Sequence, residues 1–264
     1  MPKADEHSPV AANVGDSGSG RFDLGEDGTA AMRRPFTVLL ILAPLGLLAE
    51  LHRALSSQKA TLLTEQQWAE LGSIVGLSTP LVPVVVLALG CVLVQIFRRY
   101  AWELPAMGTL ALVGLWGLAW AAIRYVVAFT ASQVGGHGPS PIDPDRLNAL
   151  GQLGLSVSGA LQEELVFRAG LLGLLCLIGR ALHGHRWMDY AVMLPISAVL
   201  FSLAHTEIIN HHAGAETWSF AVFLQRFVAG LLYGYVFLRQ GLATATLAHA
   251  GYNIAVLFRL GPWL

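Results

Sequence analysis

Charged residues are scarce in this sequence: they make up 12% of the 264 residues, whereas hydrophobic residues make up 55%. Soluble domains usually carry about 25% charged residues, so this composition excludes an ordinary soluble domain. Apolar runs of about 16 to 30 residues take up most of the chain, which indicates a protein that crosses a membrane several times. The formal net charge is −1, and no basic patch with interleaved aromatic residues is present. We therefore expect a lipid bilayer around the protein and no nucleic-acid partner.

Cysteine is also rare. The two cysteines, Cys91 and Cys176, lie inside apolar runs, without metal-ligand spacing and without charged neighbours. They are therefore predicted to be small core residues rather than a disulfide, a metal site or a reactive thiolate. No serine or cysteine stands beside a histidine in a nucleophilic arrangement, which excludes the common acyl-enzyme mechanisms.

The apolar runs predict an all-α fold, a polytopic transmembrane helix bundle of about seven spans in three parts. Residues 1–35, rich in Gly, Ser, Ala and Asp, are expected to form a disordered tail, residues 36–146 the amino-terminal membrane helices and loops, and residues 147–258 a transmembrane core. The polar, acidic start argues against a cleaved signal peptide. The expected spans are 36–51, 74–97, 104–130, 147–178, 190–204, 218–238 and 242–258.

Arginine placement gives an expected orientation. More arginines fall at one set of span ends than at the other, and the richer side is expected to be cytoplasmic. The composition is compatible with a multi-pass protein of a cell membrane, and specifically with a bacterial inner membrane. Arg124 lies near the far end of the 104–130 span, where its side chain is expected to reach the interface as an anchor. The arginines of the richer side are Arg33, Arg34, Arg98, Arg99, Arg180, Arg186 and Arg239.

Three ionisable residues interrupt the fourth apolar run, at Glu163, Glu164 and Arg168. Glu164 and Arg168 are four residues apart, so they share a helix face and can pair. Glu163 is rotated by roughly 100° and is free to point elsewhere. A charge at mid-bilayer costs roughly 2.5–3.5 kcal/mol on insertion scales, so such residues usually face the bundle interior and mark function. An ion pair that only locks helix packing would explain Glu164 with Arg168, but it would leave Glu163 without a role.

Polar residues interrupt two later spans as well. His205 follows Phe201 by four residues at the end of the fifth span, and His249 precedes Asn253 by four in the last span. Histidine and asparagine N–H groups are donors that can stabilise an oxyanion, although polar residues in membranes also join helices by hydrogen bonds. A buried carboxylate beside an imidazole can take a proton from water and deliver it to a leaving amine. This is the equipment needed to hydrolyse a peptide bond.

These motifs, Glu163-Glu164-xxx-Arg168, Phe201-xxx-His205 and His249-xxx-Asn253, occur in that order at span positions. Together they resemble the three motifs of the CAAX-processing and bacteriocin-processing (CPBP, or Abi) family of membrane proteases. The resemblance covers about residues 147–258. It implies an intramembrane endopeptidase that cleaves membrane-associated, prenylated or other peptide substrates. It also implies that Glu163, assisted by His205, activates water, that His249 and Asn253 form the oxyanion site, and that Glu164 and Arg168 hold the geometry.

Metal dependence stays open at this point. Zinc could be bound by Glu163 or Glu164 together with His205 and His249, since three protein ligands plus water is a common catalytic arrangement. The sequence has no His-Glu-x-x-His helix, and the same residues serve a metal-free glutamate mechanism, which we favour. His211 and His212 are expected to be loop residues outside the site.

Other function classes also stay open. The intramembrane charges alone would suit a proton-coupled transporter, although the internal repeats or broken helix pairs typical of transporters are not evident. A non-catalytic membrane partner or immunity protein with the same fold is the third possibility. Arg226, inside the sixth span, requires a partner such as Glu207, Glu216 or a substrate carboxylate. The sequence leaves the oligomeric state and the identity of the substrate undetermined.

Overall fold

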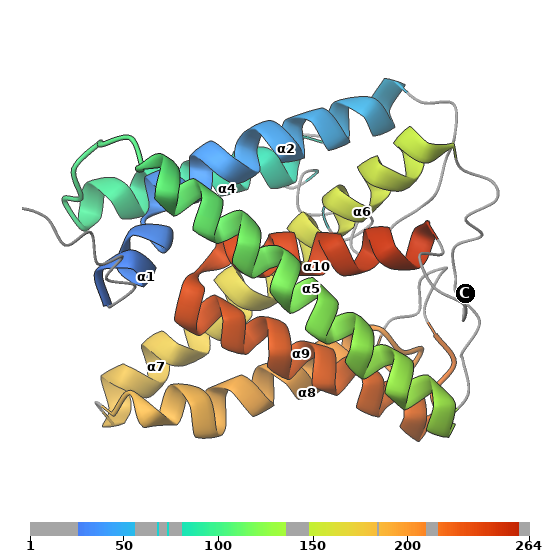
Figure 1. Ribbon diagram of the computed structural model, residues 1–264. Helices are drawn as coiled ribbons and strands as arrows, with labels where there is room; N and C mark the ends of the chain where they lie inside the picture. Colours follow the sequence, from blue (N-terminus) through green and yellow to red (C-terminus); the bar gives the residue numbers. More distant parts are fainter. Residues whose placement is uncertain are drawn as a thin grey trace, which may run out of the picture.

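The computed structural model describes residues 26–55, 68, 73, 81–135, 148–183, 185–209 and 216–258. Over these residues the chain is helical, as predicted, and it contains an isolated β-bridge between Thr206 and Glu216 but no β-strand. Figure 1 shows the helices packed as one bundle. In chain order the elements are α1 (Glu26–Met32), α2 (Pro35–Leu55), α4 (Val82–Phe97), α5 (Met107–Gly135), α6 (Ala149–Glu164), the π-helix η2 (Leu165–Leu172), α7 (Gly173–His183), the π-helix η3 (Asp189–Met193), α8 (Leu194–Ala204), α9 (Phe220–Gln240) and α10 (Leu242–Leu257).

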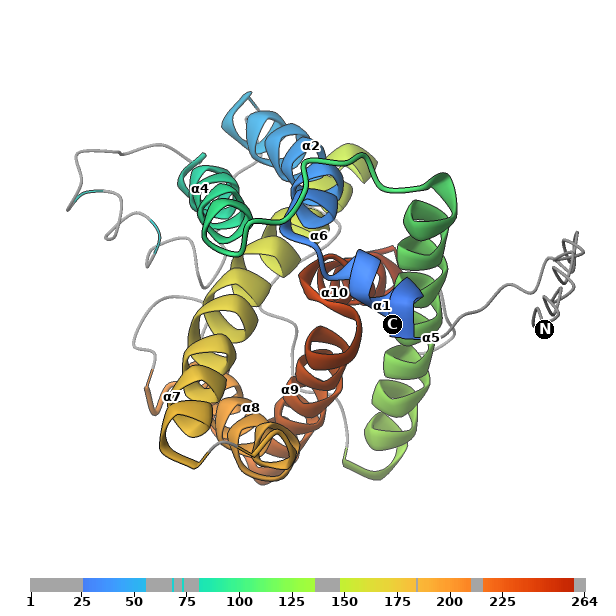
Figure 2. The ribbon, with the colours of Figure 1, turned by 90° about the vertical axis from the view of Figure 1, so that its left-hand side faces the viewer.

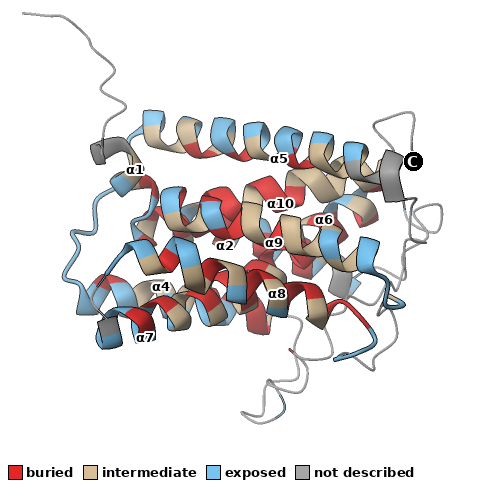
Figure 3. Cartoon of the chain, turned by 90° about the horizontal axis from the view of Figure 1, so that it is seen from below, coloured by how far each residue is buried: buried red, intermediate tan, exposed pale blue. Residues whose placement is uncertain are grey.

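The helices agree with a multi-pass membrane bundle of roughly the predicted size. Four of those described are long and apolar enough to cross a membrane, over Pro35–His52, Met107–Thr130, Ala149–Leu182 and Phe220–Gln240. Three shorter apolar helices accompany them, over Val82–Phe97, Asp189–Ala204 and Leu242–Leu257. Figure 3 shows buried residues on the faces that helices turn toward one another and exposed residues on the outer faces. Many of the exposed side chains are large and apolar, which suits a surface in contact with lipid.

Several predicted boundaries differ from the structure. Within the predicted tail, α1 forms over Glu26–Met32 and buries Met32, while residues 1–25 lie outside the described residues. In the second span the described helix starts only at Val82, followed by Pro83 in its first turn, where a missing N–H costs no helix hydrogen bond. Residues 136–147, between the third and fourth predicted spans, lie outside the described residues, and α5 continues beyond the third predicted span to Gly135.

Helix α10 lies at the centre of the bundle, packed against α5, α6 and α9 (Figures 1 and 2). Small residues make this possible, because they let helix backbones approach closely in a membrane. A Cβ added at Gly251 of α10 would lie 2.9 Å from Ala121 Cβ of α5, closer than carbon atoms pack. Four alanines of α10 are almost fully buried: Ala243, Ala245, Ala248 and Ala250.

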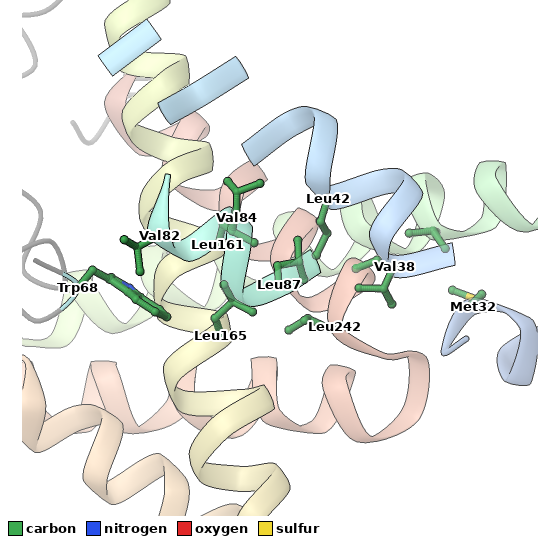
Figure 4. Packing of buried hydrophobic residues seen from close by; sticks show 12 residues of the cluster. Met32, Val38, Leu42, Trp68, Val82, Val84, Leu87, Leu161, Leu165 and Leu242 are labelled. Carbon is green, nitrogen blue, oxygen red and sulfur yellow. The ribbon is translucent and has the colours of Figure 1, made fainter. Parts of the chain in front are cut away.

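The other half of the bundle is built in the same way. At the α8–α9 contact, a Cβ added at Gly230 would lie 2.9 Å from the backbone Cα of Ala198. On the opposite side, α2 packs on both α6 and α4, and a cluster of aliphatic side chains from the three helices includes Leu42, Leu87 and Leu161 (Figure 4). The two packing regions hold α6, α8 and α10, which carry the three motifs, in fixed positions around one interior.

Arg124 is not an interfacial anchor, which corrects the prediction. Its side chain is 2% exposed and lies on α5 with its guanidinium carbon 4.4 Å from the centre of the Tyr252 ring of α10. The physical reason is packing, because α5 lies against α10 and Arg124 contacts the Tyr252 ring of that helix.

Candidate active site

The Glu-Glu-Arg stretch lies where α6 passes into η2. Glu164 is the last residue of α6, and Arg168 lies inside the π-helical segment, a rare conformation that is often found at functional sites. The predicted pair is present: Arg168 Nε lies 3.2 Å from Glu164 Oε2, and both side chains are essentially inaccessible to solvent. Glu163 points in another direction and is 15% exposed. One carboxylate is thus tied to an arginine, and the other is partly accessible.

His249 of α10 contacts both glutamates. Its Nδ1 lies 2.9 Å from Glu164 Oε1, and since a carboxylate only accepts, the ring donates a proton from Nδ1. The other ring nitrogen, Nε2, lies 3.8 Å from Glu163 Oε2. Glu164 therefore fixes the orientation of the His249 ring, whose second nitrogen is turned toward Glu163.

His205, at the end of α8, repeats this arrangement with a different partner. Its Nδ1 lies 2.8 Å from the carbonyl oxygen of Phe201, so Nδ1 donates and Nε2 of the neutral ring carries the free lone pair. This Nε2 lies 3.3 Å from Glu163 Oε2. The Nε2 atoms of two histidines from two helices therefore approach the same carboxylate oxygen.

Aromatic rings enclose the charged cluster. The guanidinium carbon of Arg168 lies 4.2 Å from the centre of the Phe201 ring and 5.6 Å from that of Tyr233. Tyr233 also stacks on the His249 ring, with centroids 4.5 Å apart and planes at 16°. The Phe201 and His205 rings are likewise 4.5 Å apart. These rings fix both imidazoles and supply a cation–π contact for the buried arginine.

The remaining predicted residues fall into two groups. Asn253 lies one helical turn beyond His249 and is half-buried, but it takes no part in the hydrogen bonds and ion pairs that join the cluster across the described residues. His211 and His212 lie outside the described residues. The structure therefore brings five of the six polar motif residues into direct contact and leaves Asn253 beside them.

Arg226 finds its partner in Glu216, one of the three candidates predicted. Arg226 Nε and Nη2 lie 3.0 and 2.5 Å from the two oxygens of that carboxylate. The backbone N–H of Glu216 in turn donates to the carbonyl of His205 at 2.9 Å. Burial raises the pKa of Glu216, but the charge and hydrogen bonds of Arg226 lower it more, so the pKa lies below its ordinary value. The ion pair thus ties the segment at Glu216 to the end of α8 that carries His205.

Sequence reasoning missed one buried carboxylate near the site. Glu50 of α2 is fully buried and accepts hydrogen bonds from Ser158 and, at 2.9 Å, from Gln162 Nε2 of α6. Gln162 directly precedes Glu163, so α2 holds the turn of α6 from which the accessible glutamate projects. The sequence could have indicated this residue, because Glu50 is a charged residue inside the first apolar run, and such residues usually face the bundle interior.

The residues suited to a metal are fewer than the four predicted. Both oxygens of Glu164 are already engaged, by His249 and Arg168, which makes this residue a poor ligand. Glu163 Oε2 and the Nε2 atoms of His205 and His249 are the donors that remain. Across the described residues, no group of three or more His, Cys, Asp or Glu side chains has the arrangement of a metal site.

The fold and the site together define a membrane-embedded helical protein with an ionisable cluster in its interior. Residues 146–255 match the family described as Type II CAAX prenyl endopeptidase Rce1-like. This match confirms, over the carboxy-terminal part of the chain, the family resemblance that the three motifs carry. Comparisons with curated proteins and with solved structures give no significant match.

Proposed function

We propose that this protein hydrolyses a peptide bond of a membrane-associated or prenylated substrate, with water as the nucleophile and Glu163 as the general base. One observation carries the proposal: Nε2 of His205 and Nε2 of His249 lie 3.3 and 3.8 Å from the same oxygen of Glu163. Each ring already donates its Nδ1 proton to another group. A water held between Glu163 Oε2 and the Nε2 lone pair of His205 would have both its protons directed at bases, with Nε2 of His249 left to face the oxyanion.

The residues support a balanced hydrolysis. Glu163 takes a proton from water, and the water oxygen bonds to the scissile carbonyl carbon, giving a tetrahedral intermediate. Its oxyanion would accept hydrogen bonds from the side chains of His249 and Asn253. His249 carries a proton on each ring nitrogen throughout the reaction, so Nε2 donates to the oxyanion and the Glu164 carboxylate at Nδ1 neutralises the charge. Glu163, assisted by His205, then delivers the proton to the leaving nitrogen as the carbon–nitrogen bond breaks.

The proposed mechanism is metal-free. If zinc takes part instead, Glu163, His205 and His249 are the residues that would hold it, with Glu164 and the Phe201 carbonyl fixing the two imidazoles from behind. Bound zinc would supply Lewis-acid activation of water, leaving Glu164 and Arg168 in the same supporting roles.

The test is cleavage of a fluorescent S-farnesylated CAAX peptide by purified protein in lipid nanodiscs. Glu163→Gln should reduce the rate by roughly 10²–10⁴-fold, the usual contribution of a general base. Glu103→Gln is the matched control, because Glu103 is exposed and pairs with Arg34 outside the site. Chelation should leave cleavage unchanged. Undiminished cleavage by Glu163→Gln would overturn the proposal, loss on chelation with recovery on zinc addition would establish the metal mechanism, and proton-coupled flux without cleavage would establish a transporter.

A further inference from the structure

Arg124 is a buried cation that the proposed mechanism does not use. Its side chain is 2% exposed, and neither Nε nor Nη1 has a hydrogen-bond partner among the described residues. An isolated charge is costly in a protein interior, and the face of Tyr252, 4.4 Å away, compensates it only in part. Two other buried glutamates are committed elsewhere, Glu164 to Arg168 and His249, and Glu50 to Ser158 and Gln162.

The position of Arg124 is close to the catalytic cluster. Tyr252, beneath its guanidinium, follows His249 by three residues and directly precedes Asn253 on α10. Side chains three apart on a helix are neighbours, with Cβ atoms about 5–6 Å apart. Tyr233, which stacks on His249, has its hydroxyl within electrostatic range of both Arg124 and Glu164. That hydroxyl also lacks a hydrogen-bond partner in the part of the chain that the structure describes.

Among the described residues, two side chains with buried donor atoms that lack acceptors, Arg124 at Nε and Nη1 and Tyr233 at its hydroxyl, thus lie beside α10. We propose that Arg124 binds the free α-carboxylate at the carboxy terminus of the substrate; this rests on the proposed function and deepens it. A guanidinium fork matches a carboxylate in a bidentate pair. In a CAAX sequence three residues follow the prenylated cysteine, and three extended residues reach about 10 Å. That reach exceeds the Cβ separation of about 5–6 Å between residues three apart on α10, so a peptide with its scissile carbonyl at His249 can extend its terminus to the guanidinium over Tyr252.

The phosphate of a phospholipid could also pair with the Arg124 guanidinium, but the depth of Arg124 within the membrane span favours a substrate carboxylate. Arg124 lies six residues before the end of the apolar span at Thr130, about 9 Å along the helix axis, and seventeen residues after its start at Met107. Lipid headgroups lie at the membrane surface, whereas a peptide whose scissile bond enters the bundle interior carries its terminus to this depth. Arg124 is therefore placed to select substrates with a short, free carboxy-terminal segment.

The test is binding, measured on Glu163→Gln protein so that no substrate is cleaved. A fluorescent S-farnesylated CAAX peptide is titrated, as the free acid and as the C-terminal amide, into protein in phosphatidylcholine nanodiscs. The free acid should bind about tenfold more tightly or better, as expected for a buried charge-assisted pair. Adding Arg124→Gln should remove this preference and leave amide binding unchanged, and Arg124→Lys should keep part of it. Arg34→Gln, the loss of an exposed arginine, should keep it all.

A purely structural Arg124 gives a different result. Because this cation has no counter-ion among the described residues, Arg124→Gln should not lower the melting temperature. If Arg124 were structural, the variant would have a lower melting temperature and would still bind the free acid more tightly than the amide. Equal binding of acid and amide, or no binding of either, overturns the proposal. Anionic phosphatidylglycerol could instead raise the melting temperature only when Arg124 is present, while the acid and amide peptides bind equally. That result would assign the site to a lipid phosphate. Cleavage of both peptide forms at one rate by the unmodified chain overturns the proposal but leaves the proposed function standing.

Discussion

His249 and Glu164 are joined across α10 and α6, with Nδ1 of the histidine 2.9 Å from Oε1 of the glutamate. The other oxygen of Glu164 pairs with Arg168 at 3.2 Å. The carboxylate that neutralises the buried arginine is thus the same group that orients the imidazole. A stabilising ion pair and a component of the proposed oxyanion site therefore depend on one side chain.

Replacing Glu164 by Gln should reduce both stability and activity. The substitution leaves Arg168 buried without a counter charge, and removing one partner of a buried ion pair costs about 3–5 kcal/mol. Thermal unfolding in nanodiscs measures the first effect and peptide cleavage the second. Adding Arg168→Met should recover stability, because the unpaired charge is gone, but not activity, because His249 still lacks the carboxylate that neutralises its charge. A Glu164→Gln protein as stable as the unmodified chain would contradict this account.

Close packing of α5 on α10 gives a second prediction. Gly251→Ala places a Cβ 2.9 Å from that of Ala121, so the two helices must separate, at a cost of about 1–3 kcal/mol. The contact is between two side chains, and Ala121→Gly should therefore restore the melting temperature.

The contact at Gly230 provides the control. There the added Cβ would meet the backbone Cα of Ala198 at 2.9 Å, as well as its side chain. Ala198→Gly removes only the side chain, so it should fail to rescue Gly230→Ala. Equal rescue at both positions would show that the backbone approach at Gly230 does not limit packing.

Local pattern was enough to predict part of this site. Four-residue spacing placed Glu164 and Arg168 on one face, and the ion pair is present because helical pitch alone determines that neighbourhood. The same rule placed Glu163 on a different face. Composition and apolar runs gave the all-α bundle, since a helix is one of the few structures that satisfies its own backbone in lipid.

Contacts between helices could not be predicted from the sequence in the same way. Spacing gives no indication that Glu163 meets both histidines, because that contact depends on how α6, α8 and α10 pack. Arg124 was misplaced because one arginine in an apolar run does not reveal which face of the helix is buried. The link between Glu216 and His205 runs through backbone groups, which carry no residue-specific signal.

The Glu216–Arg226 pair should make stability depend on pH. The pKa of Glu216 is lowered in the folded protein from its ordinary value of 4.5. The pair therefore contributes fully above that value, and its contribution is lost as the pH falls through the lowered folded-state pKa. Glu216→Gln should lower the melting temperature near neutral pH, and its difference from the unmodified chain should shrink in more acidic buffer. A difference that stays constant across this range would show that the carboxylate charge is not the stabilising feature.

The central claim is that Glu163 and His205 act as one unit on the same water, and a double-mutant cycle of cleavage rates tests it most directly. Rates are measured for the unmodified chain, Glu163→Gln, His205→Asn and the double variant, each confirmed as folded by its melting temperature. Residues that act as a unit are strongly non-additive. We predict that His205→Asn slows cleavage greatly on its own and by less than about threefold in the Glu163→Gln background. Losses that multiply in full would mean that the two side chains act independently and would contradict the proposed mechanism.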